Sequence, residues 1–215
     1  MYDFLRGPLV WIALITFGVG LTLRVFWMIR TIGKDPTVLP AMTARHSLRS
    51  IFFWLLPYGS RSMRTRPFFS GLSYAFHVCL LLVPVFAMGH AVLWQQSWGI
   101  RWWSLPPLMA DLMTAVVLVA GLVFFLRRIM APEVRNVNTV WDYVILLITL
   151  GPFITGFIAY HQWLDYRTII ILHMVTGAVW LIAIPFTWLQ HMFMFFFSRA
   201  FMGSEFGAVR NARDW

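Results

Sequence analysis

The sequence contains five apolar runs, each about as long as an α-helix needs to cross a lipid bilayer. They lie at roughly 8–29, 68–94, 107–125, 140–160 and 169–197. The chain is 60% hydrophobic and 12% charged, whereas soluble domains are about half apolar and about a quarter charged. We therefore predict an all-α integral membrane protein, in which residues 1–215 form a single domain, a bundle of five transmembrane helices in contact with the lipid bilayer.

The distribution of lysine and arginine predicts the orientation of these helices. Of 17 such residues, 13 lie in the segments 30–67, 127–139 and 198–215, and three lie in the segments on the opposite side. The positive-inside rule then places the N-terminus outside and the C-terminus in the cytoplasm, in the cytoplasmic (inner) membrane of a prokaryote. Arg24, within the first run, is expected to snorkel to the inner surface. Because the positive excess is explained by orientation, no nucleic-acid partner is expected.

The cytoplasmic loop 30–67 is the one loop long enough to hold structure of its own. Its stretch 45–56 mixes basic and apolar residues, as an interfacial helix does, and Pro57 would end it. Two interpretations of the loop stay open: a solvated positive-inside segment, or a docking surface for a soluble subunit. The single cysteine, Cys79, lies within an apolar run and is expected to be a small buried hydrophobe. Covalent haem attachment through a CxxCH motif is excluded.

Four of the six histidines lie within the predicted spans, where ionisable side chains are costly and tend to mark functional sites. His77 and His90 belong to the second span, and His173 and His191 to the fifth. Because these two helices run in opposite directions, His77 and His191 share the cytoplasmic half of the membrane, while His90 and His173 share the outer half. The sequence therefore predicts two pairs of histidines at different depths.

Two facing neutral imidazoles are the ligand set of a low-spin haem b. On a continuous fifth helix, 18 residues make five turns, so both of its histidines would leave one face about 27 Å apart. On the second helix, 13 residues leave an angle of about 140°, and a distortion at Pro84 is required to bring both rings to one side. Gly89 and Gly177, beside the ligands, would leave room for a macrocycle. We therefore predict two haem b cofactors with these four histidines as axial ligands.

A family resemblance extends over the same residues. The run from Leu172 to Gly177, continued from Ile184 to His191, resembles the last helix of the gamma subunit of respiratory nitrate reductase, a NarI-type dihaem cytochrome b. The segment 124–135, with Asp142 after it, resembles the cytoplasmic turn between the third and fourth helices of that family. The spacing of His77 and His90 is longer than in the nitrate reductase branch. In this respect the chain more closely resembles the membrane cytochromes of heterodisulfide-reductase-like redox complexes, such as those of sulfate reducers.

The resemblance implies a dihaem b electron-transport subunit of a respiratory redox complex. His77 and His191 would ligate the inner haem, and His90 and His173 the outer haem. The subunit would exchange electrons between the quinone pool, menaquinone or another quinone, and a cytoplasmic iron–sulfur subunit of the heterodisulfide-reductase-like or nitrate-reductase-like kind. A periplasmic multihaem cytochrome c is an alternative electron donor. Any enzyme activity would then belong to the complex, since the chain has no motif for substrate chemistry of its own.

Other polar residues are candidates for supporting roles. Oxidation of a quinol at the outer surface requires a proton acceptor, and the residues at the right depth are Asp111, Gln95, His161 and Asp165. Asp111 is explained equally well as an acid favoured by a helix N-terminus. Near the inner surface, arginines suited to pairing with haem propionates are Arg127, Arg128 and Arg199. Positive-inside placement explains these arginines equally well.

Two other functions are compatible with the sequence. The cytochrome b of a hydrogenase or formate dehydrogenase shares the haems but has four spans, so a fifth span argues against it. A membrane anchor or transporter without haem would use its histidines as structural or proton-relaying groups. The haem content of the purified protein separates this second alternative from a cytochrome.

Overall fold

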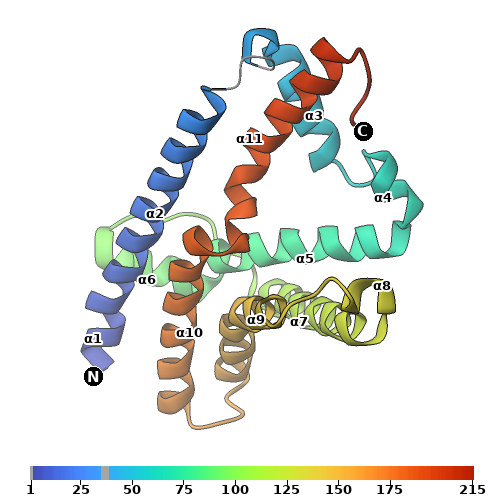
Figure 1. Cartoon of the computed structure of the whole chain (residues 1–215). Helices are drawn as coiled ribbons and strands as arrows, with labels where there is room; N and C mark the ends of the chain where they lie inside the picture. Colours follow the sequence, from blue (N-terminus) through green and yellow to red (C-terminus); the bar gives the residue numbers. More distant parts are fainter. Residues whose placement is uncertain (1, 35–38) are drawn as a thin grey trace. The chain divides into compact units, whose positions relative to one another are not determined.

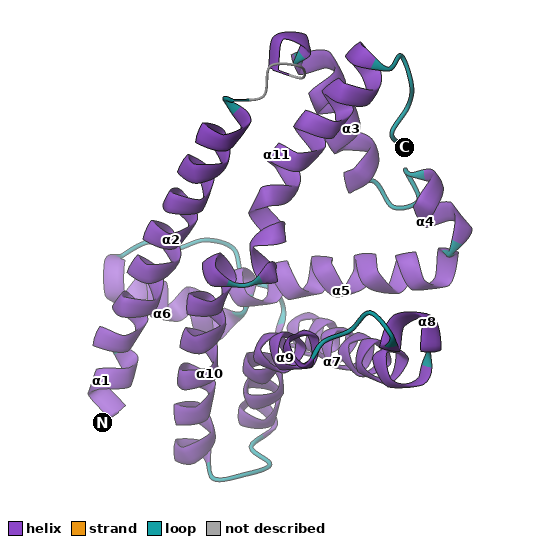
Figure 2. Ribbon diagram, in the orientation of Figure 1, coloured by secondary structure: helices purple, strands orange, loops and turns teal. Residues whose placement is uncertain are grey.

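The computed structural model describes residues 2–34 and 39–215, and the regular structure among them is entirely helical (Figure 2). The helical segments long and apolar enough to cross a membrane are Tyr2–Ile32, Pro67–Trp98, Pro107–Met130, Val140–His161 and Tyr166–Phe186. The prediction of an all-α chain with five spans is confirmed. The chain is therefore a multi-pass membrane protein in contact with a lipid bilayer.

Packing divides the described residues into two compact units. The first unit comprises residues 2–10 and 72–180, and the second comprises residues 11–34, 39–71 and 181–215. Helices α2 (Pro8–Ile32), α5 (Pro67–Phe86) and α10 (Tyr166–Phe186) each begin in one unit and end in the other. The short helix α1 (Tyr2–Arg6) belongs to the first unit.

The core of the first unit lies where α5, α7 (Pro107–Met130) and α9 (Val140–His161) pack together, and α7 and α9 run side by side (Figure 1). Lipid tails are as apolar as leucine, so close van der Waals packing is what holds such helices together. Gly121 of α7 permits it, because a Cβ there would lie 2.5 Å from Leu150 Cδ2. Cys79 is buried in this core, as predicted. The short helix α8 (Pro132–Arg135) connects α7 to α9.

The second span is interrupted at Ala87, where the backbone is extended (φ −60°, ψ 133°). Helix α5 ends at Phe86, and α6 (Met88–Trp98) begins directly after the interruption. Pro84 lies in the last turn of α5, where a proline disturbs the hydrogen bonding of the preceding turn. The distortion predicted near Pro84 is therefore a complete break three residues later.

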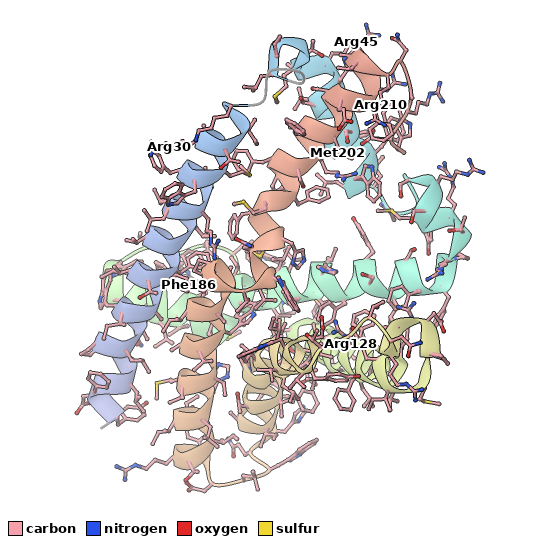
Figure 3. All side chains as sticks on the ribbon, in the orientation of Figure 1. Arg30, Arg45, Arg128, Phe186, Met202 and Arg210 are labelled. Carbon is pink, nitrogen blue, oxygen red and sulfur yellow. The ribbon has the colours of Figure 1, made fainter. Side chains whose placement is uncertain are left out.

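The prediction of one continuous helix over 169–197 is wrong. Helix α10 ends at Phe186, labelled in Figure 3, and the chain passes through the 3₁₀ turn η2 (Trp188–Gln190) into α11 (His191–Ser204). Counting whole turns from His173 to His191 is consequently not valid.

The physical cause of this break lies in Pro185 and Thr187. Pro185 lacks the N–H that would continue the ladder of the preceding turn. The Thr187 hydroxyl donates to the Ala183 carbonyl (2.8 Å) and accepts from the Leu189 N–H (3.3 Å), which replaces helical hydrogen bonds with local ones. Thr187 is extended as a result (φ −124°, ψ −176°).

Helix α2 is attached to this break within the second unit. Arg24 Nε donates to the Pro185 carbonyl at 2.9 Å, and a Cβ at Gly20 would lie 2.7 Å from the Pro185 ring. Breaking the helix deprives that carbonyl of its usual partner, which is why a guanidinium is favourable there. Arg24 was expected to snorkel to the surface, and the structure instead assigns its Nε–H to a backbone carbonyl.

The helix predicted over 45–56 is present as α3 (Ala44–Leu55), which lies beside α11 (Figure 1); its place at a membrane surface stays a prediction. Thr43 caps its N-terminus by accepting from the His46 N–H. Ser50 of α3 and Ser204 of α11 are completely buried. On the opposite side of α3, Leu48 and Phe52 are exposed, as expected of a helix that lies on a membrane surface. The remaining elements of this unit are η1 (Leu39–Ala41), α4 (Arg61–Thr65) and the π-helical turn η3 (Glu205–Val209).

Helix α10 begins after Asp165, whose carboxylate accepts a hydrogen bond from the Thr168 N–H at 2.8 Å. Hydrogen bonding from Thr168 lowers the pKa of the Asp165 carboxyl below its usual value. Because the folded-state pKa is the lower one, the stabilisation is present at neutral pH and is lost as the pH falls through that value.

Replacing Asp165 with alanine should therefore lower the thermal unfolding temperature by a few degrees at pH 7, because a helix N-cap is lost. Asp165→Asn keeps the capping acceptor, so its unfolding temperature should be close to that of wild type. Thermal unfolding scans at pH 7 and at about pH 3 measure both effects. The difference in unfolding temperature between wild type and the alanine variant should be smaller at the lower pH. A larger difference there would contradict the capping role of the Asp165 carboxylate.

Candidate functional site

His90 and His173 lie together in the first unit, on α6 and α10 respectively. Their ring centres are 5.9 Å apart and their ring planes are inclined by 14°. Imidazole nitrogens bind metal ions at about 2 Å, so two rings on opposite sides of one ion have centres about 6 Å apart. The observed separation is compatible with this arrangement and equally with offset stacking of the two rings, whose centres lie about 4.5–7 Å apart. The structure therefore brings together the two histidines predicted for the outer haem.

The orientation of His90 follows from the break at Ala87. A helix that ends leaves its last carbonyls without partners within the helix. The three carbonyls at the end of α5 accept hydrogen bonds from residues beyond the break. The Pro84 carbonyl accepts from His90 Nδ1 (2.7 Å). The Val85 carbonyl accepts from Trp102 Nε1 (3.0 Å), and the Phe86 carbonyl accepts from the Leu105 N–H (2.8 Å). The broken helix end thus holds the His90 ring in place.

His173 is positioned by α9. Its Nδ1 donates to the Pro152 carbonyl at 3.0 Å, and the Thr155 hydroxyl lies 3.3 Å from the same nitrogen. Gly156, one turn after Pro152, leaves space for the ring, because a Cβ there would lie 3.0 Å from His173 Cε1 and 3.2 Å from Nδ1. A glycine at position 156 therefore allows the ring to approach α9 this closely.

All four histidines predicted as haem ligands share one hydrogen-bonding pattern: Nδ1 contacts a backbone carbonyl. In addition to the two above, His77 Nδ1 lies 2.7 Å from the Ser73 carbonyl and His191 Nδ1 lies 2.8 Å from the Trp188 carbonyl. A carbonyl only accepts, so in the neutral ring Nδ1 carries the proton and Nε2 carries the lone pair. Metal-ligating histidines adopt this tautomer: one ring nitrogen binds the metal, and the other donates a hydrogen bond that holds the ring.

The two remaining histidines differ from this pattern. His46 Nδ1 contacts the Thr43 hydroxyl at 2.8 Å, and His161 contacts the Asp111 carboxylate through Nε2 at 2.9 Å. The distinction drawn from the sequence between four ligand candidates and two other histidines thus has a counterpart in the hydrogen bonding.

The proposed inner pair belongs to two units, since His77 lies on α5 in the first and His191 begins α11 in the second. Their pairing stays a prediction. Within the described ranges 2–34 and 39–215, no cluster of three or more His, Cys, Asp or Glu side chains is arranged around a metal ion. A bis-imidazole haem site requires only two protein ligands.

The two glycines predicted to leave room beside the ligands both lie in open space. A Cβ built on Gly177, one turn after His173, would meet no heavy atom within 4 Å, and the same holds for Gly89, which is exposed. The donor set is also suitable, because neutral imidazoles with fixed tautomers are haem iron ligands. The assignment of His90 and His173 to an outer haem b stays a prediction at this point.

Asp111 and His161, two of the residues predicted near the outer surface, are joined by a contact of 2.9 Å between Oδ1 and Nε2. Asp111 lies at the start of α7 and His161 at the end of α9, and their side chains are 21% and 30% exposed. Aromatic rings surround the imidazole: Phe157 at 4.5 Å, Tyr160 at 5.1 Å and Trp163 at 5.3 Å. Gln95, on α6, makes no side-chain hydrogen bond to this pair among the described residues.

Two of the three arginines predicted as propionate partners pair with carboxylates of the chain itself. Arg128 lies 3.3 Å from Asp142, and Arg199 lies 3.7 Å from Asp214. Arg127 lies in the last turn of α7. A carboxylate already within reach of a guanidinium reduces the gain from a second anion, so Arg128 and Arg199 are weaker candidates for haem propionates than the sequence indicates.

Comparison with known proteins places the chain in a family. A protein of Nitratidesulfovibrio vulgaris (strain Hildenborough) is 36% identical to it over 217 residues, which cover 98% of this chain and 95% of that protein. The chain belongs to the same family as this protein. The similarity extends over all five spans of the chain. No family model and no solved structure matches the chain.

Sequence reasoning missed the contribution of α9 to the site. Pro152, Thr155 and Gly156 together provide the acceptor, the hydroxyl and the space that fix the ring of His173. The available signal was the spacing of Pro152 and Gly156, one helical turn apart in the span before His173, because glycine at such a position permits close approach of a side chain from another helix.

Replacing Gly156 with leucine should displace the His173 ring from the Pro152 carbonyl and reduce occupancy of the outer haem by more than about half. The haem content of the purified protein measures the effect. Gly18→Leu on α2 is the matched control, because a Cβ at Gly18 meets no heavy atom within 4 Å. Equal haem content in both variants would contradict the role given to Gly156.

Proposed function

We propose that this chain is the dihaem b membrane cytochrome subunit of a respiratory redox complex and carries electrons across the cytoplasmic membrane. The observation that carries the proposal is the His90–His173 pair, with ring centres 5.9 Å apart and both Nδ1 atoms bonded to backbone carbonyls. Haem iron, when bound, would supply one-electron oxidation and reduction. The five spans found in the structure favour this subunit over the four-span cytochrome b of a hydrogenase or formate dehydrogenase.

The chain's own residues would perform three tasks. His90 and His173 would bind the outer haem, and His77 and His191 the inner one, each as a neutral imidazole whose tautomer is fixed by a backbone carbonyl. The breaks after α5 and after α10 precede His90 and His191, so each of these ligands stands in the first turn of a new helix. The apolar spans would keep bulk water away from both sites.

The distribution of cations supports an N-terminus outside and a C-terminus in the cytoplasm. In this orientation, the inner site is adjacent to a cytoplasmic iron–sulfur subunit, of the heterodisulfide-reductase-like or nitrate-reductase-like kind. The outer site would exchange electrons with the quinone pool, menaquinone or another quinone, or with a periplasmic multihaem cytochrome c.

The haem content of the purified chain tests this function. A reduced-minus-oxidised spectrum, calibrated by extraction of the haem, should give about two haems b per chain. A protein that is folded and purified from haem-replete cells but carries no haem b would instead favour a membrane anchor or transporter.

The Asp111–His161 pair favours a quinol over a periplasmic cytochrome as the electron donor. Oxidation of a quinol releases protons, and a carboxylate hydrogen-bonded to an imidazole is suited to accept one and pass it outward. The aromatic rings around His161 provide an apolar, planar environment for a quinone ring. We therefore propose Asp111 and His161 as the proton-accepting pair of a quinol site on the outer side.

A further inference from the structure

A shallow cavity of about 620 Å³ in the second unit combines three arginines with aromatic side chains. Its arginines come from three separate segments: Arg61 from the start of α4, Arg199 from α11 and Arg213 from the C-terminal tail. The apolar part of its wall includes Trp54 of α3, Phe206, Trp215 and Met202, which Figure 3 labels on α11. We call this cavity the arginine pocket.

The C-terminal tail is fixed to α3 and α11 at one side of the arginine pocket. Asp214 accepts a hydrogen bond from the buried Ser50 hydroxyl (2.5 Å), and its backbone carbonyl accepts from Trp54 Nε1 (3.1 Å). The Trp215 ring stacks on Phe53, with centres 4.8 Å apart and planes inclined by 3°. The pocket wall is therefore formed by specific packing of the tail.

The charges in the arginine pocket do not balance. Arg199 is paired with Asp214 (3.7 Å) and lies over the Trp54 ring at 4.4 Å. Arg61 and Arg213 also line the cavity, and within the described part of the chain neither makes a side-chain hydrogen bond or ion pair. An anion bound in the cavity would be attracted by both guanidinium groups, which form charge-assisted hydrogen bonds with phosphate and carboxylate oxygens.

The apolar lining indicates an anion that carries a hydrocarbon part. Helix α4, which contributes Arg61 to the pocket, ends at Thr65, and the span of α5 begins at Pro67. Because a span begins at the surface of the bilayer, the arginine pocket lies near that surface, and the excess of cations in the segments 30–67 and 198–215 assigns it to the cytoplasmic leaflet. Basic pockets in this position are suited to phosphate headgroups of anionic lipids.

We propose that the arginine pocket binds the phosphate headgroup of an anionic phospholipid from the cytoplasmic leaflet. Arg61 and Arg213 bind the phosphate oxygens, while Trp54, Phe206 and Trp215 contact the glycerol and the upper part of the acyl chains. The proposal goes beyond electron transfer and does not require that the chain bind haem.

Native mass spectrometry of the full chain, released from phosphatidylcholine nanodiscs containing phosphatidylglycerol, tests the proposal. Wild type should retain phosphatidylglycerol in preference to phosphatidylcholine. Each arginine contributes about a fivefold effect near an anionic lipid, so Arg61→Gln/Arg213→Gln should weaken retention roughly 25-fold. The matched control is Arg45→Gln/Arg135→Gln, which removes two exposed arginines that do not line the pocket and should change retention less than about twofold.

Equal retention by the two double variants would overturn the proposal. Displacement of the lipid by millimolar inorganic phosphate would overturn it too, because the pocket would then bind a free anion, and displacement by an acidic peptide would indicate a protein partner instead. Thermal unfolding shows whether the double variant is folded. If it is not, Arg213→Gln alone, in the exposed tail, should weaken retention about fivefold, and unchanged retention would contradict the proposal.

Discussion

Replacing His173 with alanine should reduce the haem b content of the purified chain from about two per chain to about one. In the proposed function His173 is one of the two ligands of the outer haem, so the variant would leave His90 as the single imidazole for that iron. Haem extraction and the reduced-minus-oxidised spectrum measure the loss, and the spectrum should retain the component of the inner haem. His90→Ala should give the same spectrum as His173→Ala, because both variants remove one ligand of one site.

His46→Ala is the matched control for these variants. His46 contacts Thr43 through Nδ1 and lies in the first turn of α3, outside the five spans, so its removal should leave both haems in place. Loss of both haems in the folded His173→Ala protein, or loss of neither, would contradict the assignment of His90 and His173 to one haem.

Replacing Asp111 with asparagine should slow reduction of the chain by a quinol at least about 100-fold. Asparagine preserves the size of the side chain and an oxygen that accepts from His161 Nε2, but it lacks the negative charge needed to accept a proton. General base catalysis contributes about 10²- to 10⁴-fold to such steps. Stopped-flow reduction by a menaquinol analogue measures the rate, while the spectrum after full chemical reduction should be unchanged.

Glu133→Gln provides the control for this experiment. Glu133 is an exposed acid in the first turn of α8, at the opposite end of α7 from Asp111, so its substitution should leave the quinol rate unchanged. A quinol rate in Asp111→Asn within about twofold of wild type would exclude the Asp111–His161 pair as the proton acceptor. Electrons entering from a periplasmic cytochrome would then be the better account.

The features predictable from the sequence are those that depend on local composition. An apolar run of about 20 residues identifies a span by itself, because the backbone in a bilayer must satisfy its hydrogen bonds within the helix. The same logic singles out His77, His90, His173 and His191, since an imidazole in such a run is costly. The mixed basic and apolar pattern of 45–56 likewise predicts α3 from its own residues.

The features missed depend on contacts between segments. Pro185 alone does not reveal that α10 ends, because prolines in membrane helices are often accommodated by a kink. The end of α10 also depends on the Thr187 hydroxyl, which competes for backbone hydrogen bonds, and on Arg24, which donates a hydrogen bond to the Pro185 carbonyl. The close approach of His173 to Gly156 joins α10 to α9, and neither residue predicts it alone.

The most direct test is a density map of the purified protein in a lipid nanodisc, obtained without added haem, at a resolution that shows side chains. The account predicts a flat macrocycle between His90 and His173, with the Nε2 atom of each ring about 2 Å from its central metal and each Nδ1 still bonded to its carbonyl. Imidazoles of His90 and His173 that contact only protein or lipid, in a fully folded chain, would contradict it.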